Sequence, residues 1–166
     1  MAEITNQGNV KLSAGAGPGQ LRLDVPVLGE VRAGSFTPGL TGTGSAPSVA
    51  YQSRGGHYLR LGRLVFITGR LSLSSISGGS GNLRLTGLPF TVGGDEDERG
   101  YIDVAIYNAA TWPANSTQTF GLGMPGQTLV GVYGVGTGTG ALNFTPANLG
   151  NTTTIRFGGF YLTDEP

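Results

Sequence analysis

The chain has 166 residues, of which 31 are glycine and 12% are charged, and ten acidic residues balance ten basic ones. This length suits one domain with a proper core, and the absence of cysteine excludes disulfides, cysteine-based zinc sites and thiol nucleophiles. A neutral chain argues against general nucleic-acid binding, because phosphate neutralisation dominates that affinity. The low share of charged residues is instead typical of a protein that covers part of its surface in an assembly.

The N-terminal part of the chain differs from the rest. Its first ten residues, MAEITNQGNV, contain no basic or apolar segment, so no signal peptide is expected, and no apolar run approaches the length of a membrane span. Residues 13–20 have the composition of a linker, and residues 20–32 alternate as one strand or an extended arm. Residues 33–48 are rich in turn formers, and we expect little regular structure there. We therefore predict a docking arm over 1–33 and a compact domain over 34–166.

In the compact domain, short apolar runs alternate with turn signals, as in β-strands. No long segment keeps the apolar spacing of a helix without an interrupting glycine or proline. The pattern predicts an all-β fold, an antiparallel β-sandwich of the jelly-roll kind. The expected strands are residues 48–53, 57–61, 63–75, 81–90, 100–108, 116–124, 127–135, 139–146 and 152–163.

The segment from His57 to Ser75 predicts a hairpin. Gly62 and Arg63 stand at its centre, and glycine at the first central position is typical of a type II′ turn. Side chains alternate between the two faces of a strand. The face that we assign to the core carries Val65, Ile67, Leu71 and Leu73.

The opposite face of this second strand carries Leu64, Phe66 and Arg70. Two apolar residues on that face indicate that something covers it, and we assign all three residues to a subunit interface. A buried charge requires a partner, so we expect Arg70 to find one near that interface.

The sequence offers few groups for catalysis. His57 is the only histidine, no G-x-S-x-G motif accompanies it, and we interpret it as a polar residue at the start of a strand. Hydrolysis of a polysaccharide requires two carboxyl groups, but outside residues 95–98 and the termini the compact part has only Asp103. One histidine without cysteine leaves no zinc site. We predict no enzyme, no catalytic residue, no metal and no cofactor.

The acidic run from Asp95 to Glu98 has two interpretations. Oxygen-rich loops can bind calcium, but the D-x-[DN]-x-[DN]-G spacing is absent and consecutive residues rarely point at one centre. The simpler interpretation is a solvated loop between strands.

Trp112, the only tryptophan, lies in the polar segment 108–117. A large apolar residue in such a loop either closes the edge of the core or forms an exposed platform for stacking. Aromatic faces stack on the C–H faces of sugars, and asparagine amides bond their hydroxyl groups. As a platform, Trp112 would share a glycan-binding site with Tyr107, Asn108 and Asn115.

Several motifs together resemble the distal, receptor-binding knob domain of bacteriophage tail fibres and related virion spikes. The resemblance covers roughly residues 34–163 and depends on the order and spacing of its parts. These parts are Phe36-Thr37-Pro38, the segment from Tyr58 to Gly62, the strand from Val65 to Leu71, the stop Gly87-Leu88-Pro89-Phe90, and the closing FGGFYLT of residues 157–163.

The resemblance implies a homotrimeric β-sandwich knob on the virion surface that binds host-surface polysaccharide and is not an enzyme. Tail-fibre knobs usually end much longer chains, whereas only about 33 residues precede the knob here. We therefore expect a short spike whose residues 1–33 dock on other virion proteins, without nucleic-acid binding or membrane insertion. Two alternatives stay open: a structural decoration protein without a receptor role and, third, a small polysaccharide hydrolase.

Overall fold

The computed structural model describes residues 11–14, 21–25, 29–138 and 140–166. Their regular structure is almost entirely antiparallel β-strand, which confirms the predicted all-β class. No helix among these residues is long and apolar enough to cross a membrane. The elements are β1 (Lys11–Ala14), β2 (Leu21–Val25), β3 (Gly29–Phe36), β4 (Gly39–Gly42), β5 (Ser48–Leu61), β6 (Leu64–Ser77), β7 (Leu83–Thr86), the 3₁₀ turn η1 (Glu96–Glu98), β8 (Tyr101–Tyr107), β9 (Gln118–Gly123), β10 (Leu129–Val135), β11 (Leu142–Asn143), the 3₁₀ turn η2 (Pro146–Asn148) and β12 (Thr154–Leu162).

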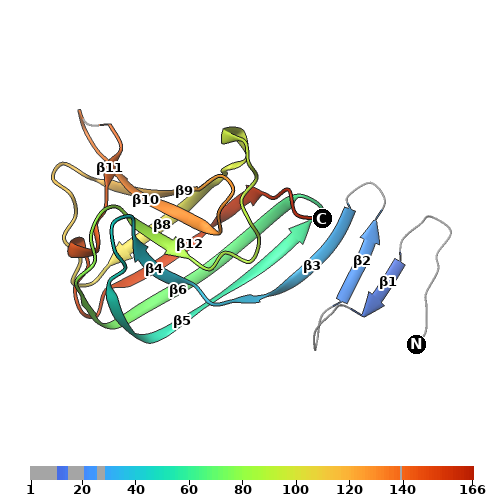
Figure 1. Ribbon diagram of the computed structural model, residues 1–166, viewed down its shortest axis with the longest axis horizontal. Coiled ribbons are helices and arrows are strands. Elements are labelled where there is room, and N and C mark those ends of the chain that lie inside the picture. Colours follow the sequence, from blue (N-terminus) through green and yellow to red (C-terminus); the bar gives the residue numbers. More distant parts are fainter. Residues whose placement is uncertain (1–10, 15–20, 26–28, 139) are drawn as a thin grey trace.

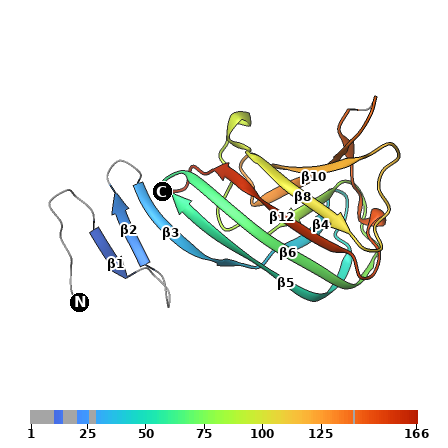
Figure 2. The same ribbon diagram turned by 180° about the vertical axis from the view of Figure 1, so that it is seen from behind.

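The described strands form one continuous sheet in the order β1-β2-β3-β5-β6-β12-β8-β9-β10-β7-β4, and β11 pairs with β10. The sheet curls on itself, so that β10, β7 and β4 pack over β5, β6, β12 and β8 as the two layers of a sandwich (Figure 1). Strands β1 and β2 project from the sandwich beside β3, as both views show (Figure 2).

The core lies between the two layers. Strand β8 shows how it forms, because Ile102, Val104 and Ile106 are buried while the residues between them are exposed. The predicted core face of β6 is confirmed, since Val65, Ile67, Leu71 and Leu73 are all at most 5% exposed. Burying each such side chain stabilises the fold by roughly 1.5–3 kcal/mol.

The hairpin between β5 and β6 is confirmed. Leu61 pairs with Leu64, which leaves Gly62 and Arg63 as the two turn residues. Gly62 has a φ of +58° and Arg63 has no positive φ, as a type II′ turn requires.

The two strands expected at 48–53 and 57–61 are one strand, β5, so the prediction of a break between them is wrong. Gly55 and Gly56 continue the ladder by pairing with Arg70 and Gly69, and irregular pairing around Tyr51 bends the strand instead. His57 therefore lies within a long strand and not at the start of one.

The expectation of little regular structure at 33–48 is also wrong. This segment contains the end of β3 and all of β4, which pairs with β7. The predicted boundary between residues 33 and 34 falls within β3. In the arm, residues 13 and 14 of the expected linker belong to β1, residues 20–32 contain β2 and the beginning of β3, and residues 1–10, 15–20 and 26–28 lie outside the described part.

Two glycines on β5 and β6 leave space for aromatic rings of the core. Gly56 and Gly69 pair with each other in the centre of β5 and β6, between Phe36 on β3 and Phe157 on β12. A Cβ atom at Gly56 would lie 2.5 Å from the Phe36 ring, and one at Gly69 would lie 2.3 Å from the Phe157 ring. The rings occupy the space that side chains would otherwise fill.

Candidate binding site on the outer face of the sheet

We call the side of β5, β6, β12 and β8 that points away from the core the outer face. The register of the four strands aligns its side chains in rows. One row contains Gly55, Arg70, Arg156 and Ala105, and a second contains His57, Thr68, Gly158 and Asp103. A third contains Leu59, Phe66 and Phe160.

An open groove, which we call the aromatic groove, runs along β8 on this face. Two of the predicted glycan-binding residues, Tyr107 and Trp112, border it together. Because β9 lies beside β8, its first residues also reach the groove. Its other polar and aromatic lining residues are Tyr101, Asp103, Gln118 and Thr119.

Trp112 both closes the edge of the core and borders the groove. Its ring packs edge-on against the buried ring of Phe144, with centroids 6.1 Å apart and planes at 74°. The side chain is half-buried, and part of it lines the aromatic groove. The plug and the platform are therefore compatible, and stacking on a sugar stays a prediction.

The other two predicted glycan-binding residues do not line this groove. Asn108 and Asn115 are exposed, with φ values of 59° and 65°. Asparagine tolerates this left-handed conformation better than most residues. Both residues therefore have a structural role in turning the chain between β8 and β9.

A second open groove, which we call the basic groove, lies on β5, β6 and β12 next to the first. On the outer face it is lined by Arg70, Arg156 and His57 among mostly small residues. Arg54 borders it from the other side of β5, where its guanidinium lies over the Tyr51 ring. Arg156 Nε donates a hydrogen bond to the hydroxyl of Tyr107 over 3.0 Å, which joins the two grooves. Sequence reasoning missed this cluster because only the pairing of β12 with β6 brings Arg156 beside Arg70.

The predicted interface residues lie on the same face. Phe66 is 41% exposed and forms an apolar row with Leu59 (41%) and Phe160 (48%), while Leu64 is half-buried. The rings of Phe66 and Phe160 are 6.2 Å apart. Arg70 has no carboxylate partner among the described residues. Its register partner on β12 is another arginine, Arg156, and its side chain donates to Ser72. Among the described residues, the three side chains of the apolar row stay exposed.

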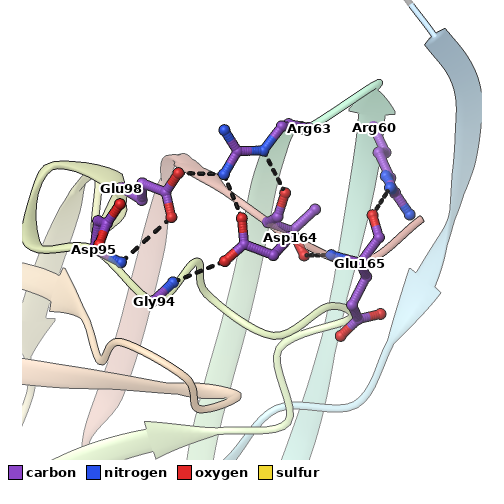
Figure 3. A network of polar contacts seen from close by, with 8 residues as sticks. Arg60, Arg63, Gly94, Asp95, Glu98, Asp164 and Glu165 are labelled. Atoms are coloured by element: carbon purple, nitrogen blue, oxygen red, sulfur yellow. Dashed lines mark hydrogen bonds and ion pairs between the residues drawn. The ribbon is translucent and has the colours of Figure 1, made fainter.

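The acidic run lies beside the hairpin between β5 and β6, in an ion-pair network around Arg63 (Figure 3). Glu98 is only 9% exposed and, with Asp164, accepts hydrogen bonds from the Arg63 guanidinium. Asp95, Glu96 and Asp97 are exposed, as the simpler interpretation of a solvated loop expected, and that interpretation is wrong for Glu98 alone. Within the described residues, no group of three or more His, Cys, Asp or Glu side chains is placed to hold a metal ion.

The same network fixes the C-terminal segment. Arg60, only 3% exposed, donates hydrogen bonds to the carbonyl oxygens of Gly62 (2.6 Å), Glu165 and Pro166 (3.0 Å). A hydrogen bond from the Gly94 amide and the neighbouring Arg63 guanidinium lower the pKa of Asp164.

Two further groups of this region have shifted pKa values. Hydrogen bonds from Thr91 lower the pKa of Glu165, whose Oε1 accepts from the Thr91 amide over 2.6 Å. Burial raises the pKa of Tyr161, whose hydroxyl donates to the Phe90 carbonyl over 2.9 Å.

No protein-family model matches the sequence, and no curated protein matches it significantly. Among solved structures, the fold is similar to part of the Dettilon tailspike protein, with a TM-score of 0.60 and 22% sequence identity. The similarity covers 79% of this chain and 23% of the tailspike chain, so this chain spans about a quarter of that protein's length. At this identity the similarity shows a shared fold.

Proposed function

We propose that the chain is a virion structural protein of a phage-like particle, a short spike or fibre knob that attaches the particle to host-surface glycan. The observation that carries the proposal is the aromatic groove, an open groove that Tyr107 and Trp112 line together with polar residues. The fold's similarity to part of a tailspike protein supports the same role. The proposed location is accordingly the surface of the virion.

The groove has the chemistry that sugar recognition requires. The rings of Tyr101, Tyr107 and Trp112 offer apolar faces to sugar C–H groups, and Asp103 and Gln118 offer acceptors and donors to hydroxyl groups. A groove open along a strand suits a polymer better than a small enclosed ligand. A single contact of this kind is weak, so display in several copies would raise the avidity without new contacts.

The proposed assembly is a homotrimer in which a neighbouring copy of the chain covers the apolar row of Leu59, Phe66 and Phe160. Three large apolar side chains that are each at least two-fifths exposed form a strip of the kind that marks interaction sites. The net charge of zero means that copies do not repel one another. A stable monomer in sedimentation at micromolar concentration would contradict this assembly.

The proposed docking arm to other virion proteins is the part of residues 1–33 that precedes β3, because residues 31–33 pair with β5 in the sandwich. Strand β1 ends the described sheet, so its outer edge has no strand partner among the described residues. Such an edge can add a strand of another protein through main-chain hydrogen bonds. Deletion of residues 1–25 should therefore release the protein from particles but leave its binding to cells unchanged.

The attachment role is tested with Tyr107→Ala, because Tyr107 is 40% exposed and its removal leaves the core intact. The control is Arg84→Ala, which truncates a half-buried side chain on β7, in the other layer and outside both grooves. Adsorption of labelled protein to host cells should fall in the first variant and persist in the second. Equal adsorption by all three proteins would refute the groove as the attachment site.

Two other roles have their own readouts. A decoration protein without a receptor role would leave adsorption unchanged in Tyr107→Ala while its removal lowers the heat stability of the particle. A hydrolase would release reducing ends from host polysaccharide. Asp103 is the single carboxylate among the lining residues of the described aromatic groove, so the hydrolase lacks a second carboxyl group there.

A further inference from the structure

Two arginines face each other directly on the outer face. Arg70 on β6 and Arg156 on β12 are register partners, and both are exposed on the same side of the sheet. Like charges directly opposite each other destabilise a sheet. The opposed pair of Arg70 and Arg156 therefore costs the sheet stability.

Neutral groups position these two arginines. Arg70 donates to Ser72 Oγ over 3.3 Å, and Arg156 donates to the Tyr107 hydroxyl. No carboxylate of the described residues forms an ion pair with either of them. In contrast, an ion pair with a glutamate is formed by each of Arg32, Arg63 and Arg99.

The basic groove is thus a preoriented cluster of positive charge without a counter-charge. Arginine presents a planar fork of donors that matches carboxylate, sulfate and phosphate groups. The bond between Arg156 and Tyr107 places this cluster beside the aromatic groove. A polymer whose sugar rings stack on Tyr107 and Trp112 would carry its substituents over the arginines.

We propose that Arg70 and Arg156, with His57 beside them, bind the anionic substituents of the polysaccharide whose sugar rings occupy the aromatic groove. The ligand class is an acidic polysaccharide, with carboxylate, sulfate or phosphate groups. This inference rests on the proposed attachment role and defines its ligand more narrowly.

The test measures binding of purified full-length chain to four probes by calorimetry: polygalacturonate, dextran sulfate, neutral dextran and oligo(dT). An acidic probe should bind, and its affinity should fall with added salt, because salt screens exposed charges. Neutral dextran should bind more weakly than the acidic probes. Arg70→Gln and Arg156→Gln should each lower the affinity for the acidic probe roughly ten- to hundredfold, which is the effect of losing a charged hydrogen bond. The control Arg84→Gln makes the same charge change on β7, in the other layer.

Stability gives a second readout. Arg70→Gln removes one charge of the opposed pair, so its Tm at low salt should equal or exceed that of the unchanged protein, and the gain should shrink as salt screens the repulsion. A clear loss of Tm would show that Arg70 has a structural role and would overturn the proposal.

Other results would also overturn it. These are equal binding of dextran and the acidic probes, equal weakening by Arg84→Gln, preference for oligo(dT), or loss of self-association in Arg70→Gln. Cell adsorption separates the two proposals. If Tyr107→Ala abolishes adsorption and Arg70→Gln does not, attachment stands and the acidic ligand is wrong; if neither variant changes it, both are wrong.

Discussion

Substitution of Gly69 by alanine tests whether the Phe157 ring occupies the space that a side chain at position 69 would need. An ideal Cβ at this position would lie 2.3 Å from Cζ of Phe157, whereas ordinary contacts begin at 3.4 Å. The ring must therefore retreat by about 1 Å, but Phe157 is only 5% exposed and Phe36 lies 6.2 Å away. Space for that movement is lacking in a close-packed core.

The expected loss follows from two opposing effects. Overpacking of a core costs about 1–3 kcal/mol, and removing a glycine from a strand returns about 0.5–1 kcal/mol of backbone entropy. The middle values of these two ranges give a fall in the unfolding free energy of about 1.3 kcal/mol. For a chain of this size the Tm should fall by roughly 2–5 °C, as measured by calorimetry.

A neighbouring glycine supplies the control. At Gly55 a Cβ would meet no atom within 4 Å, so Gly55→Ala should melt at or slightly above the original Tm. In a Phe157→Leu background, Gly69→Ala should cost less by about 1 kcal/mol, because residues in contact are energetically coupled. If Gly69→Ala has the same Tm as Gly55→Ala, or loses the same unfolding free energy in both backgrounds, the Phe157 ring is not the reason that position 69 requires glycine.

Three further predictions concern other parts of the fold. Tyr161→Phe removes the buried hydroxyl that bonds the Phe90 backbone, so urea denaturation should show a loss of about 1–3 kcal/mol, and an unchanged midpoint would contradict this. Asp164 and Glu165 have pKa values below their ordinary 3.8 and 4.5. The stability that these carboxylates give the folded protein is therefore complete above the ordinary pKa values, and it is lost as the pH falls through the lowered pKa values. The fall in Tm on acidification below about pH 5 should be smaller in the double variant Asp164→Asn/Glu165→Gln, and an equal fall would refute the assignment. Gly62→Ala places alanine at a φ of +58° and should lower stability by about 1–2 kcal/mol, more than Gly62→Asn; equal Tm values for the two variants would contradict the turn assignment.

Much of the strand pattern could be predicted from the sequence. The alternation of Ile102, Val104 and Ile106 with polar residues specified β8 and its buried face, because the side-chain period of a strand is two. The turn at Gly62 could be predicted because glycine readily adopts positive φ. Gly55 and Gly56 misled the prediction, since the sequence alone does not show that neighbouring strands hold them in the ladder.

The site was predicted only in part. The sequence suggested Tyr107 and Trp112 from residue type and loop composition. Only the register of β12 against β6 placed Arg156 opposite Arg70, and only the order of strands placed Gln118 beside β8.

By itself, then, the sequence determined the all-β class, the hairpin and the core face of β6, because strand periodicity and turn chemistry are local properties. The curled order of the sheet, the two joined grooves and the unpaired arginines were decided by the tertiary structure. Their physical cause is pairing between strands that are far apart in the chain, such as the 86 residues that separate Arg70 from Arg156. Such pairing depends on the packing of the whole sandwich and leaves no local signal in the sequence.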